Sequence, residues 1–183
     1  MSVRFLFFAS FLALGISPAR AATVAPVTFE QLVVQSSHIT RGEVIATNSR
    51  WNDSRTTIVT DVRLRTLESF KGSSSELVFT QIGGTVGKLK VSAEGVAPFV
   101  VGDEVIVFVK PVNDGLQLTG ATQGRFDVVT DPRNGQKLVR GLVQDTTVDK
   151  SSGSPQLQDL KSFSAKLQQQ IVQPDESSTQ GGQ

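Results

Sequence analysis

The chain contains no cysteine and no tyrosine, and it has one histidine, one tryptophan and one methionine. Without cysteine, a thiol nucleophile, a disulfide and a thiolate metal site are excluded. His38 is the single histidine, so zinc sites built from two or three histidines cannot form within one chain, and any Ser-His-Asp triad must use this residue. We interpret His38 as an ordinary residue at the entrance of a strand, and we predict no catalytic residue, no cofactor and no metal.

A surplus of charge of one sign is also missing. The 183 residues include 18 Lys and Arg against 17 Asp and Glu. A nucleic-acid-binding protein normally carries a basic surplus, so this balance argues against nucleic acid as a partner.

The longest apolar run is too short to cross a membrane. It extends over residues 5–16, after Arg4 and before Pro18. Such a run spans about 18 Å as a helix, whereas the hydrocarbon core of a bilayer is about 30 Å thick. We therefore expect no transmembrane anchor, and we expect residues 1–21 to be a signal peptide cleaved after Ala21, with Ala19 as the nearest alternative. Cleavage would deliver the protein to the periplasm or the medium.

The rest of the chain has a size that suits one domain with a core of its own. We divide it into a β domain over residues 22–150, a helix over 151–173 and a disordered tail over 174–183. Within the β domain we expect a short helix over 29–36. We expect strands over 39–47, 56–69, 76–82, 88–91, 104–110, 116–119, 124–130 and 136–143.

Two of these strands have distinctive patterns. In 56–69, apolar residues and threonines alternate with Asp61, Arg63 and Arg65, which predicts one face in the core and one solvated face. In 104–110, five consecutive apolar residues predict a strand that is buried on both faces. Short strands separated by frequent turns indicate an antiparallel sandwich or a small barrel.

The C-terminal segment repeats apolar residues every three or four positions, which is typical of an amphipathic helix. We expect Ser154 as its N-cap and Pro155 in its first turn. The apolar stripe would pack either on the β domain, which we favour, or on a partner. It consists of Leu157, Leu160, Phe163, Leu167 and Ile171.

The order of segments in the middle of the chain resembles a group of exported bacterial proteins of uncharacterised function. More distantly, it is similar to the netrin-like module of tissue inhibitors of metalloproteinases. The resemblance covers residues 29–143 and rests on HITRGEVIATNSRW, TTIVTDVRLRTLESFKG, ELVFTQIGG, PFVVGDEVIVFV and GLQLTGATQGRFDVV. It implies a mainly β fold with an OB-like antiparallel β-barrel, a short N-terminal helix and a C-terminal amphipathic helix.

One departure from this family bears on mechanism. In the animal inhibitors, an N-terminal cysteine held by disulfides binds the zinc of the protease. This chain has no cysteine, so the inhibitory residues have no counterpart here. Only the fold is carried over, and a fold does not imply a function.

Two segments are candidates for partner binding. Residues 48–55 form a polar connection with Trp51 and Arg55, in which the tryptophan is either an exposed anchor or folds back over the end of the barrel. The second segment holds Gly83, Gly84, Gly87 and Lys88. Its glycine spacing does not fit a phosphate-binding loop, so we interpret it as a flexible or bulged loop beside the barrel.

Other charged residues have simpler explanations. Asp103 and Glu104 suit the start of a strand, and Asp131 suits a turn. No segment matches a calcium-binding loop. We therefore predict an exported, non-enzymatic binding protein that contacts a protein or peptide, such as a secreted protease, through its loops. A periplasmic protein that binds a small ligand or glycan is the alternative, and a hydrolase is a third reading.

Overall fold

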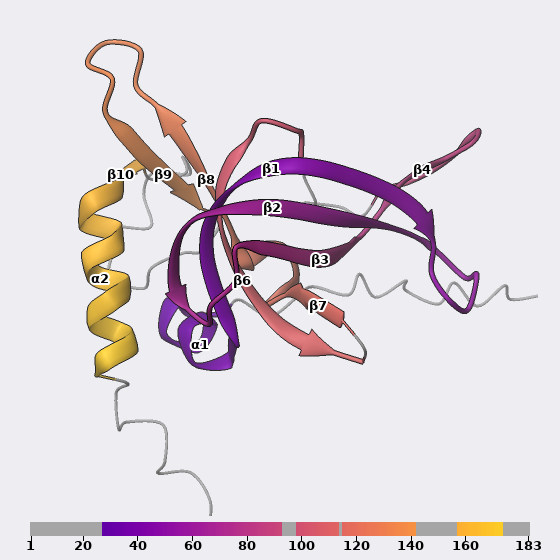
Figure 1. Cartoon of the computed structure of the whole chain (residues 1–183), viewed down its shortest axis with the longest axis horizontal. Coiled ribbons are helices and arrows are strands. Elements are labelled where there is room, and N and C mark those ends of the chain that lie inside the picture. Colours follow the sequence, from indigo (N-terminus) through magenta and orange to yellow (C-terminus); the bar gives the residue numbers. More distant parts are fainter. Residues whose placement is uncertain (1–26, 93–97, 114, 142–156, 174–183) are drawn as a thin grey trace, which may run out of the picture.

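A computed structural model describes residues 27–92, 98–113, 115–141 and 157–173, which form a mainly β fold with two α-helices (Figure 1). The helices are α1 (Phe29–Gln35), α2 (Leu160–Val172) and the 3-10 turn η1 (Ala121–Gly124). The strands are β1 (His38–Trp51), β2 (Ile58–Lys71), β3 (Glu76–Ile82), β4 (Gly84–Val86), β5 (Leu89–Val91), β6 (Glu104–Val112), β7 (Gly115–Leu118), β8 (Arg125–Thr130), β9 (Lys137–Gly141) and β10 (Leu157–Asp159). The predicted signal peptide and the predicted disordered tail lie outside the described residues.

The strands form one large sheet and one small hairpin. The large sheet has the order β1-β2-β3-β7-β6-β8-β9-β10, and β1 also pairs with β6. Neighbouring strands run antiparallel except β3 and β7, which are parallel. The small hairpin is β4–β5.

Strand β1 pairs with two strands because it bends. Its pairing with β2 is shifted between Arg41 and Gly42 and again between Val44 and Ala46. Such bulges bend a strand and increase its twist. A Cβ atom on Gly42 would lie 2.7 Å from the carbonyl oxygen of Arg65, so the two backbones approach more closely here than a side chain permits. Gly42 thus fits the bend.

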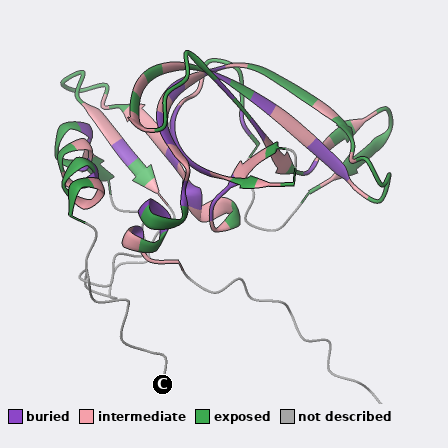
Figure 2. Cartoon of the chain, turned by 60° about the horizontal axis from the view of Figure 1, so that its bottom comes forward, coloured by how far each residue is buried: buried purple, intermediate pink, exposed green. Residues whose placement is uncertain are grey.

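Strand β6 separates two apolar clusters, and this confirms the prediction that it is buried on both faces. Residues 105–109 are completely buried. Val105, Val107 and Val109 belong to one cluster, which also holds Val44, Val62, Leu64, Leu77, Phe79, Phe99 and Leu118. Ile106 and Phe108 belong to the other. Figure 2 shows buried segments beside exposed ones along the strands.

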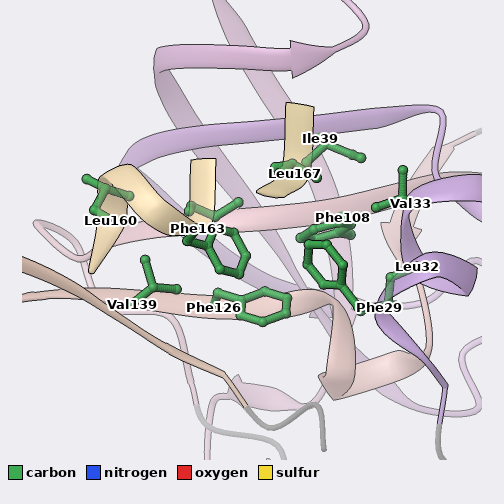
Figure 3. Close-up of a cluster of buried hydrophobic side chains, with 11 residues drawn as sticks. Phe29, Leu32, Val33, Ile39, Phe108, Phe126, Val139, Leu160, Phe163 and Leu167 are labelled. Atoms are coloured by element: carbon green, nitrogen blue, oxygen red, sulfur yellow. The ribbon is translucent and has the colours of Figure 1, made fainter. Parts of the chain in front are cut away.

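The second cluster lies between the sheet and the helices (Figure 3). The ring of Phe29 on α1 makes edge-on contacts with Phe108, Phe126 and Phe163, at centroid distances of 5.9, 6.4 and 5.6 Å. Leu160, Phe163 and Leu167 bury the apolar stripe of α2 here. The favoured packing of this stripe on the β domain is therefore confirmed.

The start of the C-terminal helix was predicted too early. Helix α2 begins at Leu160, and its N-cap is Asp159, whose carboxylate accepts the backbone N–H of Ser162 at 3.0 Å. Leu157 belongs to β10, which pairs with β9, and its side chain is 55% exposed. Ser154 and Pro155 lie outside the described residues. Helix α1 has the expected position, with a capping box between Thr28 and Gln31.

Among the described residues, no helix has the length and apolar character needed to span a bilayer.

An ion-pair network joins β1, β6 and β9 around Glu104. Its carboxylate accepts hydrogen bonds from Nε of Arg41, at 2.7 Å, and from Nζ of Lys137. Burial raises the pKa of Glu104, but these two hydrogen bonds outweigh burial and hold the pKa below its ordinary value of 4.5. The ionised form is therefore the one that the folded state favours.

We expect the Glu104→Gln variant to lose about 1–3 kcal/mol of unfolding free energy at pH 7, because two cations lose a charged acceptor. A lowered pKa contributes stability that is fully present above the ordinary value and is lost as the pH falls through the folded value. The difference between wild type and variant should therefore be largest at neutral pH and shrink below about pH 4.5. Urea denaturation at several pH values measures this, and a difference independent of pH would contradict it.

Candidate partner-binding surface

Trp51 lies at the end of a strand and not in a loop, which corrects the prediction of a connection over 48–55. Strand β1 extends through this segment because it remains paired with β2, from Asn48 opposite Asp61 to Trp51 opposite Ile58. We call residues 47–60 the β1–β2 arm. Arg50 lies on the outer face of the arm, away from the core. Its Nε donates a hydrogen bond to the carboxylate of Asp61 at 2.7 Å, which links this part of β1 to β2.

The inner face of this arm carries Trp51. Residues opposite each other in an antiparallel pair share a face, so Trp51 and Ile58 lie on the same side as Ser49 and Thr60. This is also the side of Val62, which is buried in the core. Ile58 is completely buried, whereas Trp51 is 38% exposed. Trp51 therefore stands at the outer limit of the core-facing side of the arm, with part of its ring in contact with solvent.

A compact turn at residues 52–57 closes the arm. The side-chain oxygen of Asn52 accepts the backbone N–H groups of Thr56 and Thr57, at 2.8 and 3.2 Å. Arg55 has a φ of 55°, in the left-handed region, and its side chain is exposed. An open depression of about 690 Å³ is lined by Trp51, Asn52, Asp53 and Arg55. The two candidate residues of this segment, Trp51 and Arg55, therefore share one surface feature.

The glycine-rich candidate segment is an ordered hairpin, which corrects the prediction of a flexible or bulged loop. Strands β4 and β5 pair through Gly84 with Val91, Thr85 with Lys90 and Val86 with Leu89. Gly87 and Lys88 form the turn between them, and Gly87 has a φ of 61°, which suits glycine. We call residues 84–91 the β4–β5 hairpin.

Gly83 and Gly84 join this hairpin to the β1–β2 arm. The N–H of Gly83 donates to the carbonyl oxygen of Ile58 at 2.9 Å, and the hydroxyl of Thr60 donates to the carbonyl oxygen of Gly83 at 2.7 Å. A Cβ atom on Gly84 would collide with the hydroxyl oxygens of Ser49 and Thr60. The structure therefore brings the two candidate segments together at their bases, and their tips diverge in Figure 1.

The apolar face of the β4–β5 hairpin turns toward the arm. Gly84, Val86 and Leu89 lie on one face, because alternate residues share a face and Val86 pairs with Leu89. Gly84 faces Ser49 and Thr60, so the base of this face is directed to the inner face of the arm. Leu89 is 58% exposed. Leu89 is not among the residues predicted for partner binding, although the alternation on both sides of Gly87 and Lys88 indicates a hairpin.

The cations of this surface differ in their ion pairing from those on the outer face of the sheet. Arg63 pairs with Glu76 at 3.6 Å and Arg65 with Glu43 at 2.5 Å, which agrees with the prediction of a solvated face. Burial raises the pKa of Asp61, but hydrogen bonds from Arg50 and Thr80 hold it below its ordinary value. In contrast, three exposed cations on this surface have no ion-pair partner among the described residues. They are Arg55, Lys88 and Lys90.

The remaining titratable residues occupy structural positions. His38 is the first residue of β1, and its Nδ1 lies 3.0 Å from the hydroxyl oxygen of Ser37. Asp103 accepts the N–H of Val100 at 3.0 Å, and Asp131 accepts that of Arg133 at 2.9 Å, as expected for turn residues. The described part of the chain contains no group of three His, Asp or Glu residues that could hold a metal ion.

No protein-family model, curated protein or solved structure matches this chain. The functional interpretation therefore depends on the contacts, exposure and charges of its own residues, and above all on the surface where the β1–β2 arm meets the β4–β5 hairpin.

Proposed function

We propose that this protein is an exported, non-catalytic binding protein that contacts a protein or peptide partner through the β1–β2 arm and the β4–β5 hairpin. One observation carries the proposal. Two segments separated in sequence meet at their bases, and each presents one large exposed apolar side chain, Trp51 on the arm and Leu89 on the hairpin. Tryptophan and arginine are among the residue types that dominate binding energies at protein interfaces, and this surface has Trp51 and Arg55 side by side.

The strand pairing supports an OB-like barrel as the scaffold. The sequence of pairs β1-β2-β3-β7-β6 returns to β1, and the single parallel pair is β3–β7. In OB folds, the connection between the first two strands contributes to the binding surface. Here that connection is the turn at residues 52–57, next to Trp51. The proposed surface therefore coincides with a place where OB folds bind their ligands.

The distant similarity to netrin-like modules adds one class of partner, a secreted protease. The absence of cysteine removes the chelating N-terminal cysteine of the animal inhibitors. Any protease contact would therefore use the proposed surface and not the protease metal. A small ligand or glycan is the alternative, but with no tyrosine and one tryptophan the chain offers little aromatic surface for stacking sugars.

Affinity capture from a bacterial envelope fraction tests the proposal, with the wild-type chain and two variants as bait. We expect Trp51→Ala and Leu89→Ser each to weaken capture of the same partner by about tenfold or more, the size of a hot-spot loss. Val78→Ser is the matched control, because Val78 is 47% exposed on the outer face of β3. Circular dichroism establishes that each variant is folded.

Two results would refute this function. If Trp51→Ala and Leu89→Ser are folded and retain wild-type capture, the binding surface is elsewhere. If the purified protein shows a hydrolytic activity that His38→Ala abolishes, the protein is an enzyme and the non-catalytic proposal fails.

A further inference from the structure

We infer that the segment bound across the β1–β2 arm and the β4–β5 hairpin is acidic and carries large apolar side chains. This inference rests on the proposed function, because it specifies the chemistry of the partner at the same surface. Its apolar side chains would contact Trp51 and Leu89. Its carboxylates would pair with Arg55, with Lys88 at the hairpin turn, and with Lys90, which the segment would reach across the edge of the hairpin because Lys90 alternates to the face opposite Leu89.

The apolar part of the inference follows from geometry. Trp51 and Leu89 are 38% and 58% exposed. Trp51 lies on the inner face of the arm, and Leu89 lies on the hairpin face that contains Gly84, whose backbone meets Ser49 and Thr60 of the arm. Leu89 shares its hairpin face with Val86 and Val91, which are half-buried, and Trp51 is flanked by the polar residues Arg50 and Asn52. Apolar side chains of a partner that pack against Trp51 and Leu89 would remove apolar surface from water at both elements.

The acidic part follows from the local charges. Residues 47–57 and 82–92 contain four basic residues and one acidic residue, Asp53. Arg50 is already paired with Asp61 and Asp53 on the outer face. Three cations therefore remain without an ion pair among the described residues, although the whole chain has a net charge of only +1. Complementary charge on a partner increases both the rate and the specificity of association.

An anionic membrane surface would supply the same charge, but the arm fits it poorly. Each element offers one large exposed apolar side chain, Trp51 or Leu89, which is little for insertion into an interface. We therefore infer a protein segment, and vesicles enter the experiment as a competing probe.

The single tryptophan makes the experiment direct. The chain has no tyrosine, so its intrinsic fluorescence comes from Trp51 alone. The probes are three synthetic peptides of equal length that share two leucines in a glycine-serine background and differ in carrying glutamates, lysines or glutamines. We expect the glutamate peptide to change the Trp51 emission and to bind about tenfold more tightly than the glutamine peptide, which corresponds to a few exposed ion pairs. Its affinity should fall at 0.5 M salt, because salt screens the attraction between exposed charges.

Charge-neutralising variants locate the effect. The triple variant Arg55→Gln, Lys88→Gln, Lys90→Gln should reduce the preference for glutamate over glutamine to near unity. The control triple variant Lys110→Gln, Arg133→Gln, Lys161→Gln removes the same charge from other parts of the molecule and should keep the preference. Both variants retain Trp51 as the reporter.

Several outcomes would overturn the inference. These are a glutamate peptide that binds no better than the glutamine peptide, a first triple variant that behaves as wild type, or equal losses in both triple variants. A shift of Trp51 emission with phosphatidylglycerol vesicles but not with the glutamate peptide would assign the surface to a membrane. If Trp51→Ala abolishes partner capture while the first triple variant retains it, the proposed function stands and only the acidic partner is refuted.

Discussion

Phe108→Ala is expected to lower the free energy of unfolding by about 3–5 kcal/mol, the usual cost of removing a phenyl ring from a packed core. Phe108 is completely buried on β6, and its ring lies 5.9 Å from that of Phe29 and 5.3 Å from that of Phe126. Its loss would leave a cavity between the sheet and both helices. This loss is a large fraction of the usual free energy of unfolding, which is about 5–15 kcal/mol.

Guanidinium denaturation followed by far-ultraviolet circular dichroism measures this loss. Val34→Ala provides the control, because Val34 is 61% exposed on α1, and a change within about 0.5 kcal/mol is expected there. If Phe108→Ala and Val34→Ala were equally stable, the apolar cluster between the sheet and the helices would not be a packed core.

Gly42→Ala is expected to cost about 1–3 kcal/mol, since an added methyl group must displace backbone atoms. The new Cβ would lie 2.7 Å from the carbonyl oxygen of Arg65 and 3.2 Å from the Cβ of Leu64. Strand β2 would have to move away from β1 at the bend that lets β1 pair with both β2 and β6. The cost therefore reports on the geometry of that bend.

Gly115→Ala is the matched control. Gly115 is the first residue of β7, and a Cβ atom there would meet nothing within 4 Å. Its variant should be neutral or more stable by about 0.4–1 kcal/mol, because alanine restricts the unfolded chain. Thermal and chemical denaturation of both variants compare the two sites, and a neutral Gly42→Ala would show that the strands at this bend can separate without cost.

Side-chain alternation predicted most of the strands correctly. The expected strand over 76–82 coincides with β3, and the buried run after Glu104 is the core of β6. These patterns are local, and burial on one or two faces determines them directly. The end of β1 was missed because Asn48, Ser49 and Arg50 are polar. Only their pairing with β2, which is a tertiary feature, makes them a strand.

The start of α2 shows a second limit. Ser154 and Asp159 are both good N-cap residues, and sequence offers no strong reason to prefer the later one. The structure uses Asp159, since Leu157, Gln158 and Asp159 pair with β9. A three-residue edge strand has too few positions for a periodic pattern, so it could not be recognised before its partner was known.

The candidate surface was predicted in part. Trp51 and Arg55 are candidates because they lie in a polar segment, and Gly83, Gly84, Gly87 and Lys88 because the glycines predict a flexible or bulged loop. The two segments meet at Gly83 and Gly84. Leu89 and Lys90 were missed because their importance depends on which way the hairpin faces. That direction is set by Gly84, whose φ of 135° no other residue type adopts readily.

The position of β6 has a consequence for how the protein unfolds. Its backbone carries alternate side chains into two clusters, so the two clusters share β6 as a common wall. Undocking the helices would expose one side of β6 to water, and opening the other cluster would release the same strand from the opposite side. The two cores are therefore thermodynamically coupled, and the strands and helices should melt in one cooperative transition.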